Sequence, residues 1–222
     1  MANDQKHMEY LATLLRPHEI VEFTAVLCRW LHDAHETAAD LQPARRNSSR
    51  GNWDNNTSFG TDRYQYLRAT ASSLVGELPG LMVDTSFQAL LLKLPKVGMY
   101  PLLMPSGPDR SLGDASELRR ELFGAGDGEG LFPRLDAWFS GRERLFLPWN
   151  GTEAVGLTGL WAGQGTLQED NHIDWTWRVQ LYDVASRLAA AVPSGRPAPD
   201  AFGLPQPMLP LRPRSEAPAA TE

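Results

Sequence analysis

Apolar side chains recur at helical spacing in two long segments near the start of the chain. The later of these two segments, between residues 62 and 78, predicts a helix with Thr61 as its N-cap. Pro17 suits the start of the first helix, and Pro43 is expected to help end it. The first stripe lies between residues 18 and 41, where one helical face would carry Ile20, Phe23, Leu27, Trp30, Leu31, Ala34, Ala38 and Leu41. Both helices are amphipathic, so each is expected to pack against a core.

The next part of the chain has the composition of strands. Residues 81–94 predict one or two strands and residues 99–104 another, with a turn at Pro95 to Gly98. Pro101 lacks an N–H donor, so its strand is expected to lie at a sheet edge or to be irregular.

A second strand region, residues 145–182, predicts a three-strand antiparallel meander. Asn150-Gly151 is expected to form its first turn, because both residues tolerate positive φ. The second connection is predicted near residues 168–173. The last strand alternates, so one face is expected to carry Trp175, Trp177, Val179 and Leu181. We interpret these indoles, with Trp149 and Trp161, as core residues, because each buries a large area.

Short helices are predicted around the strand regions. Asp114 and Glu117 have capping-box spacing and would open a helix that ends near residue 123. Further helices are expected at residues 133–140 and 183–192.

Helices that are segregated from runs of strands indicate an α+β fold, with a mostly antiparallel sheet packed against N-terminal helices. One domain is predicted over residues 1–192, with a long polar loop at 42–60. Proline makes up eight of the last thirty residues, so residues 193–222 are expected to form a disordered tail, because they bury too little apolar surface.

Composition narrows the class of function. The net charge of −6 disfavours nucleic acid as a partner, since phosphate binding needs a basic surface. The single cysteine, Cys28, excludes an intrachain disulfide. The chain has no apolar run of the length of a signal peptide or a membrane span, so we expect a cytoplasmic protein without membrane contact.

The polar loop carries the predicted binding site. Trp53 stands among polar residues, with Arg45, Arg46 and Arg50 nearby, and Trp and Arg are favoured at interface hot spots. Together with the absence of a complete catalytic constellation, this pattern predicts a non-catalytic binding or regulatory protein. Its expected partner is another protein, and no cofactor is expected. A small-molecule sensor with a pocket lined by the Trp strands is a further possibility.

A metal-dependent hydrolase is the alternative. Cys28, His32 and His35 lie at i, i+4 and i+7 of the first long helix, and all three are metal-ligand types. The local string HDAHE lacks the HExxH arrangement of zincins, and the three residues also fit the boundary of a packed helix.

A second candidate group lies between two predicted strands and contains Glu169, Asp170, His172 and Asp174. A His between acids can act as a general base. The hydrolase would combine His32 and His35 with His172 or Asp174, if this loop folds over the first helix. The same residue types also form ordinary polar turns.

A nuclease-like enzyme is the last alternative. A helix followed by a β-hairpin is the order of elements in the PD-(D/E)xK nucleases, and Asp84 would be the first acid of such a site. No acid stands two residues before Lys93, so the usual metal-binding pair is incomplete.

Overall fold

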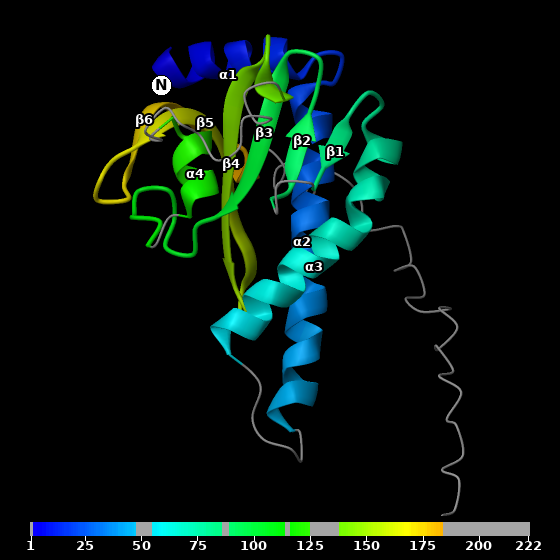
Figure 1. Cartoon of the computed structure of the whole chain (residues 1–222). Coiled ribbons are helices and arrows are strands. Elements are labelled where there is room, and N and C mark those ends of the chain that lie inside the picture. Colours follow the sequence, from blue (N-terminus) through cyan, green and yellow to red (C-terminus); the bar gives the residue numbers. More distant parts are fainter. Residues whose placement is uncertain (1, 48–54, 86–88, 114–115, 125–137, 184–222) are drawn as a thin grey trace, which may run out of the picture. The chain divides into compact units, whose positions relative to one another are not determined.

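A six-stranded sheet forms the centre of the fold (Figure 1). The computed structural model describes residues 2–47, 55–85, 89–113, 116–124 and 138–183. The strands are neighbours in sequence order: β1 (Met82–Asp84), β2 (Leu91–Lys93), β3 (Val97–Leu103), β4 (Glu143–Thr152), β5 (Gly156–Leu167) and β6 (Ile173–Gln180). The helices are α1 (Ala2–Leu15), α2 (Ile20–Arg46), α3 (Asn56–Glu77) and α4 (Glu117–Leu122).

The architecture confirms the α+β class and the mostly antiparallel sheet. Among the described strands, β3 and β4 are the one parallel pair, and the other four neighbouring pairs are antiparallel. A parallel pair needs a crossover connection, and here the crossover contains α4. None of the described helices is both long and apolar enough to cross a bilayer.

Each face of the sheet has its own apolar core. The larger core joins the sheet to α1, α2 and α3, and its fully buried members include Leu11, Leu15, Phe23, Leu27, Leu31, Leu74, Leu92, Met99 and Leu160. The smaller core joins the other face to α4 and contains Leu91, Leu102, Leu122, Phe123 and Phe146. Within it the rings of Phe123 and Phe146 stack with their centroids 3.7 Å apart.

Helix α1 was not predicted. It packs against β6 and α2, and it buries Leu11 and Leu15 completely. Its apolar stripe covers only about two turns, from Met8 to Leu15, which is too short for periodicity alone to indicate a helix.

Both ends of the predicted 42–60 loop are helical, so that prediction is wrong at its boundaries. Helix α2 continues through Pro43 to Arg46, and α3 begins at Asn56 with Asn55 as its N-cap, not with Thr61. The Asn55 side chain accepts a hydrogen bond from the Ser58 N–H, and the Ser58 side chain accepts one from the Asn55 N–H. This capping box starts α3 one and a half turns before the predicted position.

The predicted Asn150-Gly151 turn is also wrong. Both residues belong to β4, where Asn150 pairs with Gly159 and Gly151 with Leu157 across a β-bulge. The chain reverses over residues 153–155, and the positive φ is at Gly156 (82°). Crowding explains the glycine at 151, because a Cβ there would lie 2.5 Å from the Gly156 carbonyl oxygen.

The two indoles of β6 lie on opposite faces of the sheet, which corrects the predicted alternation. Gln164 pairs with Trp177 and the next residue, Gly165, pairs with Trp175, so Thr176 is an extra residue in β6. One inserted residue reverses the side-chain alternation. Trp177 therefore enters the larger core, and Trp175 packs against the smaller one.

Several predicted elements are shifted or lie outside the described residues. Ser116, not Asp114, caps α4, and its hydroxyl accepts from the Arg119 N–H. Of the predicted helix at 133–140, only residues 138–140 are described. Of the predicted helix at 183–192, only residue 183 is described. The predicted tail at 193–222 lies outside entirely.

Candidate functional site

The predicted metal ligands on α2 have separate environments. His32 is half-exposed and contacts Glu36 one turn later, at 2.9 Å. His35 is buried, with 1% exposure, and its Nε2 lies 2.7 Å from the Thr152 carbonyl oxygen. Burial raises the pKa of the Cys28 thiol to about 12, so without a bound metal this cysteine is a protonated thiol at neutral pH. In the described part of the chain, no three His, Cys, Asp or Glu side chains gather closely enough to hold a metal ion.

His172 and Asp174 lie near the turn between β5 and β6, far from the α2 histidines. Asp170 accepts a hydrogen bond from the His172 N–H at 3.0 Å, and its carboxylate lies 3.2 Å from the His172 ring. This is the geometry of an Asp-stabilised turn. His35 contacts Thr152, the last residue of β4, which pairs with Gly156 at the start of β5. The His172 turn follows the other end of β5, and a strand of twelve residues is about 35 Å long. The two predicted groups therefore do not converge.

The nuclease-like residues lie in the β1–β2 hairpin. Asp84 is half-buried and pairs with Leu91, whereas Lys93 pairs with Met82 at the other end of β1. The Lys93 ammonium lies 5.4 Å from the centre of the Trp138 ring. Lys93 thus packs on an aromatic ring, and the acid that the motif requires at residue 91 is a buried leucine.

Two of the four predicted binding residues form ion pairs within the protein. Arg45 pairs with Asp62 of α3, and Arg46 pairs with Glu153 in the turn after β4, at 3.1 Å. Both pairs are made from the last turn of α2, which continues past Pro43. Arg50 and Trp53 lie outside the described residues.

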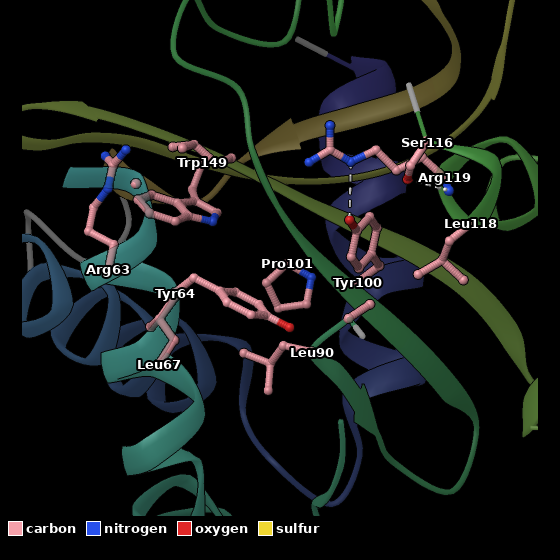
Figure 2. Close-up of a pocket in the computed structure, with 13 residues that line it drawn as sticks. Arg63, Tyr64, Leu67, Leu90, Tyr100, Pro101, Ser116, Leu118, Arg119 and Trp149 are labelled. Atoms are coloured by element: carbon pink, nitrogen blue, oxygen red, sulfur yellow. Dashed lines mark hydrogen bonds between the residues drawn. The ribbon is translucent and has the colours of Figure 1, made fainter. Parts of the chain in front are cut away.

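A cavity of about 290 Å³ opens between α3, β3 and α4. Figure 2 shows Arg63 and Tyr64 of α3 on one side and Arg119 of α4 on the other. The remaining lining residues are Gly60, Leu67, Ala89, Leu90, Tyr100, Pro101, Leu103, Ser116, Leu118 and Trp149. Among the described residues, no Asp or Glu lines this cavity.

The cavity lies where β2 stops pairing with β3. Val97 both donates a backbone hydrogen bond to Leu94 and accepts one from it. Every second residue of β3, counted from Val97, therefore turns its backbone N–H and C=O toward β2. Met99, which pairs with Leu92, is the next residue of this set, and Pro101 is the one after it, which has no N–H to continue the ladder. The expectation that the strand of Pro101 lies at a sheet edge is wrong, because β3 is an inner strand. Its recorded pairing with β2 nevertheless ends at Met99, before Pro101.

Arg63 is the unusual residue of the cavity wall. Its side chain is buried, with 6% exposure, and its Nε has no hydrogen-bond partner in the described part of the chain. The guanidinium lies 4.3 Å from the centre of the Phe59 ring and 5.4 Å from that of the Trp149 ring. Burial lowers the pKa of Arg63 to about 10, yet the side chain stays protonated at neutral pH. A cation is thus held between aromatic rings without a carboxylate partner among the described residues.

His35 is oriented by Thr152 and Arg63. Its Nε2 donates to the Thr152 carbonyl, which leaves Nδ1 to accept from Arg63 Nη1 at 3.5 Å. This pairing requires the neutral ring, since a protonated ring has no acceptor. Burial lowers the pKa of His35 below its ordinary value, and the positive charge of Arg63 adds to this effect.

We expect acid to destabilise the fold through His35. The unfolded chain takes up the proton near pH 6.5, whereas folded His35 takes it up only at lower pH. The stability is therefore fully present above the unfolded pKa and is lost as the pH falls through the folded pKa. Chemical denaturation of the wild type and of His35→Gln between pH 7.5 and 4.5 should show a smaller loss in the variant. His32→Gln, which changes an exposed ring on the same helix, is the matched control. Identical slopes for the wild type and His35→Gln would contradict the assignment.

Comparisons with known protein families, with curated proteins and with solved structures find no significant match to this chain. Arguments about function therefore depend on the site itself.

The sequence contained a signal for Arg63 that was not used. Phe59, Arg63 and Leu67 are spaced by four residues, so the arginine occupies a core position of the α3 stripe. An arginine in such a position is rare unless it is paired. No comparable sequence pattern indicated Arg119 as a site residue. It lies on α4, which faces α3 across the cavity only because of the crossover between β3 and β4.

Proposed function

We propose that this protein is a non-catalytic binding protein that recognises an anionic group in the cavity between α3, β3 and α4. The observation that carries the proposal is Arg63, a buried cation on the cavity wall that has no acidic partner among the described residues. A guanidinium forms paired hydrogen bonds with carboxylates and phosphates, so its natural complement is an oxyanion.

The energetics of burial support a ligand-binding role. Removing an ion from water costs several kcal/mol, whereas cation–π contacts return about 0.5–2 kcal/mol each. The rings of Phe59 and Trp149 thus offset part of the cost of burying Arg63 but supply no counter-charge. A bound anion would supply it.

The separation of the candidate catalytic groups supports a non-catalytic role. The α2 histidines and the His172 turn lie at opposite ends of β5, and Cys28 is a protonated thiol. A partner that approached Arg45 and Arg46 would compete with their ion pairs to Asp62 and Glu153. At Arg63, by contrast, no carboxylate of the described residues would compete with a ligand.

The test compares Arg63→Met with Arg29→Met. Both changes remove one positive charge, but Arg29 pairs with Glu77 near the other end of α3, which is about 20 Å from Arg63 along the helix. Melting temperatures are measured with inorganic phosphate, benzoate or an acidic dipeptide. At least one anion should stabilise the wild type and Arg29→Met by about 2–3 kcal/mol when it is present at a hundredfold excess over its Kd. Arg63→Met should not respond, although its free energy of unfolding should be no lower than that of the wild type.

Two outcomes would contradict the proposal. In the first, no anion in the panel stabilises the wild type more than it stabilises Arg63→Met. In the second, Arg63→Met loses more than about 2 kcal/mol of stability, as expected for a purely structural residue.

A further inference from the structure

The walls of the cavity restrict the ligand beyond its charge, and this inference rests on the proposed function. The volume of about 290 Å³ lies at the lower end of the range of small-molecule pockets, about 300–1,000 Å³, and is sufficient for an aromatic ring with its substituents. An isolated phosphate is too small to fill it and would leave the apolar walls exposed to water.

Most of the lining is apolar or aromatic. In Figure 2 the rings of Tyr64 and Trp149 lie near Pro101, on the same side of the cavity as Arg63. Aromatic walls favour a flat apolar ligand, which they contact by stacking and edge-to-face packing. The aliphatic part of the lining comes from Leu67, Leu90, Leu103 and Leu118.

The opposite wall offers a second set of polar groups. Arg119 Nε donates to the Tyr100 hydroxyl at 3.4 Å, and Ser116 lies at the start of the same helix. This bond is long, so the hydroxyl and the guanidinium remain available to a ligand oxygen. An oxygen at the far end of the ligand, away from Arg63, would meet these groups.

We infer that the cavity binds a small aromatic carboxylate, with the carboxylate toward Arg63 and the ring against Tyr64, Pro101 and Trp149. A hydroxyl on the ring opposite the carboxylate reaches the Tyr100 and Arg119 wall. The charge selects the acid, the aromatic walls select the ring, and the second wall selects the substituent.

The experiment is isothermal titration of the full-length protein with four probes: benzoate, 4-hydroxybenzoate, benzamide and inorganic phosphate. Benzoate should bind with a Kd on the order of 0.1 mM, which is reasonable for a ligand of about ten non-hydrogen atoms. Benzamide has the same shape without the charge and should bind about tenfold more weakly or worse. The hydroxyl of 4-hydroxybenzoate should improve the affinity severalfold.

Two variants assign the contacts. Arg63→Met should abolish the preference for benzoate over benzamide, whereas Arg119→Met should remove only the advantage of 4-hydroxybenzoate. Arg29→Met should behave as the wild type. Equal affinity for benzoate and benzamide would overturn the inference.

The remaining outcomes separate the inference from the proposed function. If phosphate binds in an Arg63-dependent way and benzoate does not, the proposed function stands and the aromatic ligand is wrong. If no anion binds, both are wrong.

Discussion

Trp177→Ala is expected to lower the free energy of unfolding by about 3–5 kcal/mol, the usual cost of truncating a buried aromatic residue to alanine. The ring is 7% exposed and belongs to the larger core. It stacks on His7 with the ring centroids 5.6 Å apart and meets the edge of Tyr10, so it joins α1 to β6. Its Nε1 also donates to the Gln164 side chain at 2.7 Å, and the variant would lose this bond.

The measurement is urea denaturation together with amide hydrogen exchange. Exchange should increase most in α1, because the stacking contacts of His7 and Tyr10 with the sheet would be lost. Trp161→Ala is the control, since Trp161 is half-buried on β5 and lies outside both cores. If the two variants lose equal stability, Trp177 has no special role in holding α1.

Gly151→Ala is expected to cost about 2–3 kcal/mol through overpacking. The added Cβ would lie 2.5 Å from the Gly156 carbonyl oxygen and 2.8 Å from the His35 ring. The first contact is with backbone, which cannot move without opening the β4–β5 hairpin. The second would push His35 away from Thr152 and Arg63, so the variant should also alter the cavity wall.

Asn150→Ala distinguishes this explanation from the turn that the sequence predicted. In the structure Asn150 has no positive φ, and its half-buried side chain accepts one hydrogen bond from Thr158, so its loss should cost less than about 1 kcal/mol. Denaturation curves of the two variants decide between the explanations. An Asn150 variant that is as unstable as the Gly151 variant would support a turn at these residues.

Local pattern was sufficient for the helices and strands that have long stripes. The stripe of α2 was predicted because its buried residues recur at helical spacing over many residues. The strands of the meander were predicted although the burial of β5 does not alternate regularly. The predictions failed where one residue changed the pattern. Thr176 reversed the faces of β6, and Asn55 started α3 earlier than its apolar stripe indicated.

The candidate site was less accessible to prediction than the fold. The residues chosen from the sequence, such as His32, His172 and Arg45, are those whose chemistry is conspicuous locally. In the structure they pair with Glu36, Asp170 and Asp62. Arg63 could have been identified from its place in the α3 stripe, but its lack of a carboxylate partner could not, since that depends on what packs around it.

The sequence by itself determined the class of this protein, a sheet of mostly antiparallel strands packed with amphipathic helices. It could do so because periods of 3.6 and 2 residues are properties of a local segment. Only the tertiary structure decided that Trp175 and Trp177 face opposite cores. It also decided that the pairing of β2 with β3 stops before Pro101, and that Arg63 contacts Phe59 and Trp149. Each of these depends on segments far apart in the chain, and the free energy of burial belongs to the contact between them and to neither segment alone.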